Sequence, residues 1–404
     1  MSLTNTPTRF GSLARAFHWL TALVILTAIP LGLIANGLST GPDSIALKAQ
    51  LFSYHKTLGV AAFVLGALRI LWALLQPRPV PLHPERRLET TLAEMVHWLL
   101  YLSLVIVPLS GWVHHAAVDG FAPILWPFGQ GLPFVPKSES LAALAAATHW
   151  LFTKVMAAAI LLHILGTIKH HVIDKDATLR RMARGVVAPA MAPSMAKPHR
   201  GGIVPLALAL VIYAAGAAMA VNMTPALDTA PATASAEAAQ TAAPIGNWQV
   251  ESGALGFSVI QMGAPVSGSF ANWSADITFD DTITEGVAGR VVVDVDLTSV
   301  SLGSVTDQVK GPEFFDVATH PTARFAADLL AGPEGYRAQG ELQLRGSARA
   351  VTLPFTLQIT DDTAMMTGQL TLDRRDFGIG AGYGDEATVG YAVEVSVNLS
   401  AARK

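Results

Sequence analysis

A chain of 404 residues is long enough for two or three domains, and 51% apolar against 14% charged residues, with a mean hydropathy of +0.42, exclude an ordinary soluble protein. The net charge of −3 hides two unlike halves, because residues 1–202 carry 17 Lys and Arg against 8 Asp and Glu, whereas residues 203–404 carry 10 against 22. The chain has no Cys, which excludes disulfides, iron–sulfur clusters, thiolate ligation of haem and covalent haem attachment.

The first half contains apolar segments long enough to cross about 30 Å of hydrocarbon. The five segments are residues 17–36, 55–75, 96–114, 145–168 and 203–221. The first lacks an early cleavage site, so we interpret it as a retained helix rather than a signal peptide. The sequence therefore predicts a multi-pass membrane domain.

The basic residues between these segments predict their orientation. Three stretches, the N-terminal tail, the 77–93 loop and the 169–202 loop, hold twelve of them: Arg9, Arg15, Arg78, Arg86, Arg87, Lys169, Lys175, Arg180, Arg181, Arg184, Lys197 and Arg200. The other two loops hold one each, Lys48 and Lys137. We therefore expect a cytoplasmic N-terminus and a C-terminal half outside the membrane.

Histidines inside the apolar segments are the strongest functional signal. His149 and His163 lie 14 residues apart on the fourth segment, about 21 Å along a helix and on roughly one face. The predicted orientation places His18 at the depth of His163, and His55 at the depth of His149. Bis-histidine ligation of haem needs two imidazoles from facing helices, so the sequence predicts two haem b groups, one held by His18 and His163 and one by His55 and His149.

Three cations accompany these histidines. Arg69 lies 14 residues after His55 and is expected at the depth of the inner haem, where it either pairs with a haem propionate or snorkels to the surface. Lys56 and Lys154 are expected near the outer surface, where they either contact outer-haem propionates or a quinone head group, or snorkel.

The remaining histidines carry weaker signals. His97, His114 and His115 lie at segment ends, where a ligand role, a quinone or proton role and a plain interfacial position all stay open. His170 and His171 adjoin Lys169 and are interpreted as a basic, solvated collar. The last three, His83, His199 and His320, lie in loop-like sequence and receive no role.

Three strings connect the membrane half with a known family: FHWLTALVIL, YHKTLGV and THW…LLHILGTIKHHVIDKDATLRRM. Over about residues 9–184 the chain resembles the bacterial cytochrome b561 family. The resemblance implies a four-helix membrane cytochrome with two b haems that exchanges electrons with the quinone pool, with ligands at His18, His55, His149 and His163. Some members of this family are described as passing electrons from superoxide to quinone.

The segment 203–221 has no His and is an addition to a four-helix plan. We interpret it as an uncleaved tether, although Arg200, the apolar run and the A-x-A pattern of Ala218, Met219 and Ala220 also imitate an internal signal sequence with cleavage within 218–221. Residues 222–245, rich in Ala, Thr and Pro, are expected to form a flexible linker. The predicted domains are 1–184 (di-haem membrane domain), 185–202 (basic cytoplasmic loop), 203–221 (fifth helix), 222–245 (linker) and 246–404 (outer domain).

The outer domain alternates apolar and polar residues with period two, which is typical of half-buried antiparallel strands. The expected strands lie near residues 255–261, 268–280, 291–297, 323–330, 336–344, 351–359, 364–373 and 389–399. Eight strands in this length fit a closed barrel that holds one apolar ligand or is filled by its own side chains.

The strings LGFSV, GPEFFDVATHPTARF, GELQLRGSARAVTLPF and RRDFGIG resemble the YceI-like family over about residues 246–401. The resemblance implies a periplasmic lipocalin-like barrel that buries an isoprenoid chain such as a polyprenyl quinone. The sequence departs from the family pattern at Met262 and at 306–311. Five phenylalanines could line a cavity or belong to the core: Phe257, Phe270, Phe314, Phe315 and Phe325. Asp316, His320 and Arg324 are expected to form a salt bridge that fixes a loop rather than a catalytic group.

Two functions are open. The first is inner-membrane electron transfer coupled to quinone or quinol, as an electron carrier or a quinone-linked oxidoreductase, with superoxide as one donor. The second is a periplasmic isoprenoid or lipid carrier whose cytochrome half is mainly an anchor. The expected partners are the lipid membrane, a quinone and an unidentified electron donor or acceptor. No nucleic acid is expected, and a homodimer is one option.

Overall fold

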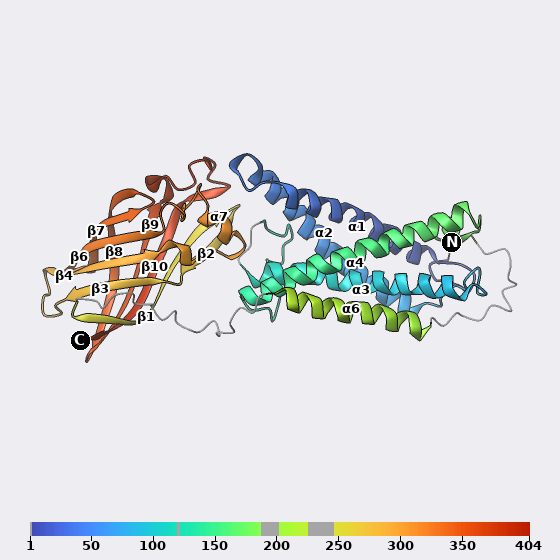
Figure 1. Ribbon diagram of the computed structural model, residues 1–404, viewed down its shortest axis with the longest axis horizontal. Helices are drawn as coiled ribbons and strands as arrows, with labels where there is room; N and C mark the ends of the chain where they lie inside the picture. Colours follow the sequence, from blue (N-terminus) through green and yellow to red (C-terminus); the bar gives the residue numbers. More distant parts are fainter. Residues whose placement is uncertain (1, 119–121, 187–201, 225–245) are drawn as a thin grey trace. The chain divides into compact units, whose positions relative to one another are not determined.

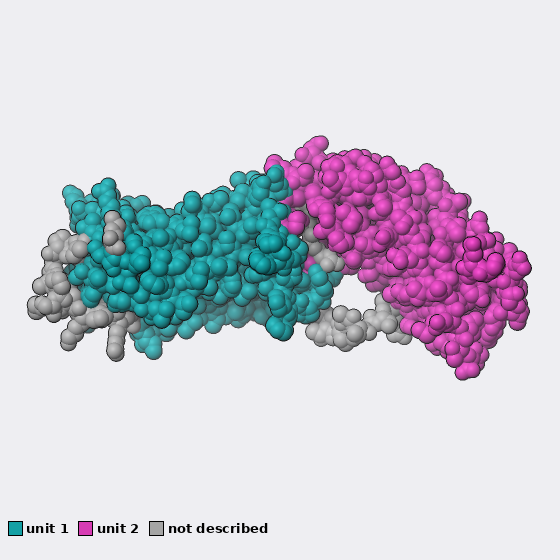
Figure 2. All heavy atoms as spheres, turned by 180° about the vertical axis from the view of Figure 1, so that it is seen from behind, with its two compact units in different colours: residues 1–37, 50–117, 124–227 teal, residues 38–49, 118–123, 228–404 magenta. Residues whose placement is uncertain are grey.

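The computed structural model describes residues 2–118, 122–186, 202–224 and 246–404. The chain divides into two compact units, one of residues 1–37, 50–117 and 124–227, the other of residues 38–49, 118–123 and 228–404 (Figure 2). The predictions for the basic loop 185–202, with Lys197, His199 and Arg200, and for the linker 222–245 fall almost entirely outside the described residues.

The first unit is a bundle of long helices that run side by side (Figure 1). The helices are α1 (Ser12–Gly37), α2 (Pro42–Leu75), α3 (Arg87–Ala117), α4 (Glu139–Val172), the short α5 (Thr178–Arg184) and α6 (Ile203–Met223). Five of these helices in the described part of the chain, all except α5, are long and apolar enough to cross a membrane. This confirms the five predicted segments. Helices α1 to α4 begin five or more residues before the predicted apolar stretches, whereas α6 begins at the predicted residue and ends two residues later.

Helix α6 is attached to the bundle through α3 and α4. The Tyr213 hydroxyl lies 2.6 Å from Ser103 Oγ and donates to the Leu99 carbonyl at 3.2 Å, while its ring stacks on Phe152 with centroids 4.6 Å apart. Gly216 faces the Phe152 ring so closely that a Cβ there would lie 2.7 Å from it. Small residues and a satisfied buried hydroxyl are typical of helix contacts in a membrane.

The second unit contains an antiparallel barrel (Figure 1). The strands are β1 (Trp248–Gln261), β2 (Ala264–Phe270), β3 (Trp273–Phe279), β4 (Gly286–Asp296), β5 (Val300–Ser301), β6 (Thr322–Gly332), β7 (Gly335–Leu344), β8 (Ser347–Thr360), β9 (Thr363–Asp373) and β10 (Val389–Arg403). Eight of them form the closed ring, because β1 pairs with β10 on one side and, at Trp248, with β3 on the other. The predicted eight-stranded lipocalin-like barrel is confirmed.

Two details differ from the expected strand pattern. The stretch 268–280 was predicted as one strand but contains the end of β2 and all of β3, which are separated at Ala271 and Asn272. Met262 and Gly263 form the two-residue turn between β1 and β2, with φ of +51° and +79°. Such a turn needs positive φ at both positions, so the Met262 departure from the family pattern lies in a hairpin turn.

Candidate functional site

We call His55 and His149 the outer pair, after the predicted orientation. Their ring centroids lie 6.1 Å apart, with the ring planes at 87°. Each ring is oriented by the backbone of a neighbouring helix: His55 Nδ1 lies 2.8 Å from the Ala28 carbonyl of α1, and His149 Nδ1 lies 2.8 Å from the Val107 carbonyl of α3. A carbonyl can only accept, so each Nδ1 carries the proton and each Nε2 keeps a free lone pair.

Two glycines allow the His55 and His149 rings to lie close to the backbone of a neighbouring helix. Gly32 lies four residues after Ala28, and Gly111 lies four residues after Val107, so each glycine is on the same helix face as the carbonyl that the ring contacts. A Cβ on Gly32 would lie 2.8 Å from the His55 ring, and one on Gly111 would lie 2.9 Å from the His149 ring. The two outer histidines are therefore held by the same local arrangement on two different helices.

His18 of α1 and His163 of α4 form the inner pair. Their ring centroids lie 5.9 Å apart at an interplanar angle of 55°. Here the neighbours are side chains: Arg69 Nη2 lies 3.2 Å from His18 Nδ1, and the His97 ring centroid lies 5.2 Å from that of His163. His97 Nδ1 in turn contacts the Ala93 carbonyl of its own helix at 2.7 Å.

Both pairs have the ring separation of two axial imidazoles on one haem iron, and the outer pair also has the free Nε2 lone pairs that iron needs. A metal–imidazole bond is about 2.0 Å long and the bonding nitrogen lies about 1 Å from the ring centre, so two axial imidazoles have centroids roughly 6 Å apart. The observed 6.1 Å and 5.9 Å agree with this distance. A ligating imidazole that donates its other N–H to a backbone carbonyl is also the usual outer-shell arrangement of a metal site.

The three predicted cations have different surroundings. Arg69 turns into the bundle, against His18 and with its guanidinium carbon 5.6 Å from the Tyr101 ring centre. Lys56 Nζ lies 3.3 Å from His115 Nδ1. Lys154 is exposed and lies over the ring of Trp150 on its own helix, at 5.3 Å. The structure thus brings Arg69 to the inner pair, whereas the contact of Lys154 within the described part of the chain is with its own helix α4.

His115 is the centre of a buried polar chain next to Lys56. Its Nε2 lies 3.0 Å from Gln130 Oε1, and the Gln130 amide is itself fixed by two hydrogen bonds to the backbone of Ile124. An ammonium can only donate, so His115 accepts from Lys56 at Nδ1 and donates to Gln130 from Nε2. The adjacent His114 instead contacts the Ala142 carbonyl at 3.0 Å.

The barrel encloses a cavity of about 310 Å³. All five of the predicted phenylalanines line it, together with the inward side chains of the ring strands. Two polar atoms in its wall, Gln261 Oε1 and Trp273 Nε1, are buried and make no hydrogen bond among the described residues. The volume falls in the usual range for small-molecule sites, about 300–1,000 Å³.

Arg374 closes one part of the cavity wall. Its guanidinium donates to five carbonyls, those of Ile379, Gly380, Tyr383, Val389 and Gly390, at 2.6–3.1 Å, and its burial lowers its pKa. These carbonyls belong to the segment between β9 and β10 and to the start of β10, so one side chain fixes that connection. The string RRDFGIG begins with this residue.

The loop-fixing salt bridge expected among Asp316, His320 and Arg324 has a different composition. Arg324 Nη1 pairs with Asp294 at 3.1 Å, its neighbour across β4 and β6. The backbone carbonyl of Asp316 accepts hydrogen bonds from the N–H groups of Thr319 and His320, and Asp316 has a φ of +49°. Asp294 and Arg324 stand opposite each other only because of the strand register, which the sequence pattern does not give.

These observations define a class: a membrane-spanning helix bundle with two facing histidine pairs, joined to a lipocalin-like barrel. The family model for prokaryotic cytochrome b561 matches residues 9–185, and the model for the YceI-like domain matches residues 247–401. The chain is 34% identical to "Cytochrome b561 homolog 2" of Escherichia coli over 183 residues, 45% of this chain and 95% of that protein. The chain belongs to the prokaryotic cytochrome b561 family and carries a C-terminal YceI-like domain, and membership of this family implies membrane electron transfer with haem b.

Further relatives match each half separately. The "Probable superoxide oxidase CybB" of Yersinia pestis is 28% identical over 176 residues, 43% of this chain and 95% of that protein. The crystal structure of Burkholderia cenocepacia BcnA shares 30% identity over 37% of this chain and 95% of that one, with a TM-score of 0.35. A Campylobacter jejuni YceI structure shares 17% identity over 34% of this chain and 84% of that one, with a TM-score of 0.31.

Proposed function

We propose that the chain is an inner-membrane electron-transfer protein that holds two b haems, one between His55 and His149 and one between His18 and His163. The observation that carries the proposal is that the ring centroids of each histidine pair lie about 6 Å apart. In the outer pair, both rings are also held by a contact between Nδ1 and a backbone carbonyl. When bound, haem b supplies reversible one-electron chemistry at iron. The protein supplies the axial nitrogens, their orientation and the apolar surroundings.

The proposed site of quinone reduction lies next to the outer pair. Reduction of a quinone to a quinol takes two electrons and two protons, and two superoxide ions supply the electrons when each leaves as O₂. The chain Lys56–His115–Gln130 offers a cation for an anionic substrate and an imidazole that can hold and release a proton. The Yersinia relative's name supports superoxide as the donor.

The barrel is the proposed binding site for an isoprenoid quinone or a similar polyprenyl lipid, and we place it in the periplasm, with the N-terminus in the cytoplasm. The almost wholly apolar cavity wall suits an isoprenoid chain, and the unpaired Gln261 Oε1 and Trp273 Nε1 could hydrogen-bond a ligand's polar group. Filling by the barrel's own side chains is the alternative. We also propose that the membrane domain, the basic loop, the fifth helix and the linker end at residues 184, 202, 221 and 245, and that α6 is not cleaved.

A redox titration of the purified full-length protein, combined with mass spectrometry of bound lipid, tests both halves. We expect a b-type spectrum with two components that quinol reduces, an intact 42.5 kDa chain and a co-purified polyprenyl lipid. A single redox component or the absence of haem would contradict the di-haem assignment, and a soluble C-terminal fragment would contradict the tether.

A cavity-filling variant tests the barrel independently of the haems. Ala338 is 2% exposed and faces the cavity, so Ala338→Phe should displace the lipid without changing the haem spectrum. The matched control is Val287→Phe, which adds an aromatic ring at a position that is 58% exposed and should leave lipid binding unchanged. Equal lipid content in both variants would show that the cavity is not the binding site.

The second candidate is a lipid carrier that uses the cytochrome half mainly as an anchor, and the size and apolar lining of the cavity favour it. The two candidates differ in one measurement, quinol-driven haem reduction by the lipid-free Ala338→Phe protein. Slower reduction favours electron transfer coupled to the barrel. Unchanged reduction means that the two activities are separate.

A further inference from the structure

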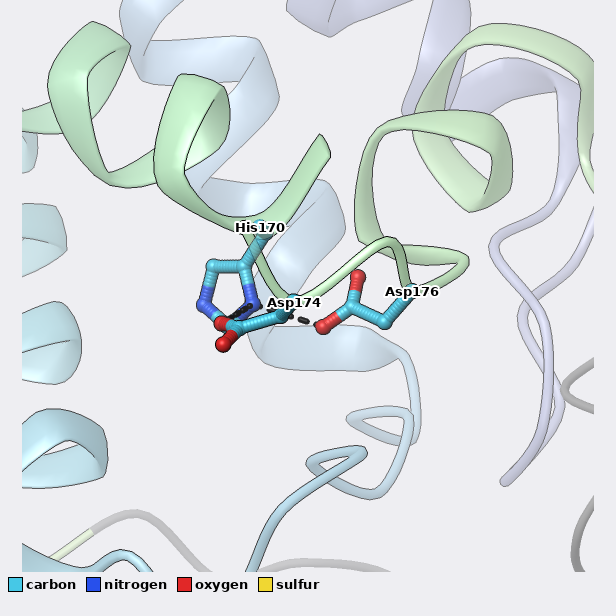
Figure 3. A group of neighbouring side chains, drawn as sticks. All are labelled: His170, Asp174 and Asp176. Atoms are coloured by element: carbon cyan, nitrogen blue, oxygen red, sulfur yellow. Dashed lines mark hydrogen bonds and ion pairs between the residues drawn. The ribbon is translucent and has the colours of Figure 1, made fainter. Parts of the chain in front are cut away.

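Four side chains that the electron-transfer proposal does not use converge at one end of the bundle. His170 lies in the last turn of α4, and Asp174 and Asp176 follow between α4 and α5 (Figure 3). A nitrogen of His170 and one oxygen of each aspartate lie within 4.8 Å of one another. His83, from the segment before α3, completes the group, with its ring stacked on that of His170 at a centroid distance of 6.4 Å.

The spacing of the donor atoms is that of a small coordination sphere. Asp176 Oδ2 lies 2.7 Å from His170 Nδ1 and 3.4 Å from His83 Nε2, and Asp174 Oδ2 lies 3.3 Å from His170 Nδ1. Ligands of a tetrahedral ion with bonds of about 2.0 Å lie about 3.3 Å apart. Two of the three distances agree with this value, and the third needs a shift of about half an ångström.

The two carboxylates are largely shielded from solvent, whereas the imidazoles of His83 and His170 are 31% and 26% exposed. The Asp174 and Asp176 side chains are only 8% and 11% exposed. His83 Nε2, which faces Asp176, is buried and makes no hydrogen bond among the described residues. Buried donor atoms of this kind are costly unless a proton or a cation satisfies them.

The surrounding charges leave room for a further cation. Arg86 and Lys169 contact the carboxylates of Asp174 and Glu89, whereas Asp176 contacts the two imidazoles and Glu85 contacts His83 at 3.3 Å. Arg181 is the third cation near the group, through its interaction with Asp176, so four carboxylates and three cations leave a charge of −1 with both imidazoles neutral. Glu89 lies 2.7 Å from Lys169 and 3.5 Å from Arg86, and these two cations therefore keep a partner when Asp174 turns to another cation.

We propose that His83, His170, Asp174 and Asp176 bind a divalent transition-metal ion, with Zn²⁺ as the best match. Imidazole and carboxylate donors at tetrahedral spacing suit Zn²⁺, whereas Mg²⁺ and Ca²⁺ prefer oxygen donors alone. The ion would join the segment before α3 to the end of α4, and so fix the entry to α5. This site is separate from both histidine pairs.

Zinc titration of the haem-loaded full-length protein, after treatment with a chelator and gel filtration, tests the proposal. We expect about one equivalent of tightly bound Zn²⁺ by calorimetry and by metal analysis. Loss of a ligand in His83→Ala or Asp176→Asn should weaken binding about 100-fold or more, because even outer-shell changes cost about 10–100-fold. The control is His171→Ala, which removes an exposed neighbouring imidazole and should bind Zn²⁺ as the unchanged protein does.

Two further readouts keep the test decisive. An unchanged haem spectrum in each variant shows that the bundle has folded. If a variant does not fold, X-ray absorption at the zinc edge of the unchanged protein should give about four nitrogen or oxygen neighbours at about 2.0 Å. The proposal is wrong if the unchanged protein binds no Zn²⁺, which would mean that a protonated imidazole balances the charge, or if His83→Ala and Asp176→Asn bind it as tightly as His171→Ala.

Discussion

The outer and inner histidine pairs have nearly the same ring separation but are held in different ways. The outer rings each contact a backbone carbonyl and a glycine of a neighbouring helix. The inner rings contact a guanidinium and a third imidazole instead. A backbone carbonyl is a fixed, neutral acceptor, whereas Arg69 carries a charge on a flexible side chain.

This difference bears on what each pair can do. Fixed Nδ1–H donors leave both outer Nε2 atoms as ready acceptors for iron. At the inner pair, Arg69 can only donate, so His18 accepts at Nδ1 and its Nε2 carries the proton. His18 therefore binds iron through Nε2 only when Arg69 leaves Nδ1 and the proton moves to that nitrogen. We expect the outer site to depend on backbone geometry and the inner site on charge, and four sets of variants test this difference.

The largest effect is expected from removal of one ligand of each pair. His149→Ala should abolish the outer redox component and His163→Ala the inner one, and each should halve the haem content, because each haem then loses one of its two axial nitrogens. Pyridine haemochrome analysis with a redox titration measures both. His171→Ala is the control, and full haem content in either ligand variant would refute the pairing.

A smaller effect is expected when a methyl group enters the outer site. Gly111→Ala places a Cβ 2.9 Å from the His149 ring, so the ring must move away from the Val107 carbonyl. We expect partial loss or a shifted potential of the outer component and an unchanged inner one. Gly166→Ala on α4 adds the same methyl group where nothing lies within 4 Å. Equal behaviour of the two alanine variants would remove the glycine argument.

The sequence predicts this contrast only in part. The periodicity of the apolar segments and the direction of each span place His18, His55, His149 and His163 at two depths, and the structure brings them together as two pairs. The roles of Gly32 and Gly111 depend on the rotation of α1 and α3 about their axes, which a nearly uniform apolar sequence does not define. The sequence also does not show which backbone carbonyls, those of Ala28 and Val107, the two histidines contact.

Other features depend on contacts between distant segments. His83 received no role, and His170 was expected in a solvated collar, because their proximity results from folding of the 77–87 segment against the end of α4. The Asp294–Arg324 pair and the break between β2 and β3 depend on register. The barrel itself was predictable, since period-two alternation gives both the strands and their inward faces.

Charge at the inner site gives the third variant. Arg69→Gln removes a cation next to His18, and a nearby positive charge favours the reduced, less positive iron centre, so the inner potential should fall. A lost interaction of about 1.4 kcal/mol corresponds to about 59 mV for one electron. Arg69→Lys keeps the charge and should restore most of the potential. A shift confined to the outer component would contradict the placement of Arg69.

The smallest effect is expected from His97→Leu. His97 lies 5.2 Å from His163, close enough to compete with His18 as the second inner ligand. If His18 is the ligand, the variant keeps both haems and moves the inner potential only slightly, because one neutral ring is lost from its surroundings. If His97 is the ligand, the variant loses the inner component while His18→Leu keeps it. The paired titrations therefore decide which imidazole faces His163, and they test whether side chains alone can hold an inner ligand as firmly as backbone carbonyls hold the outer ones.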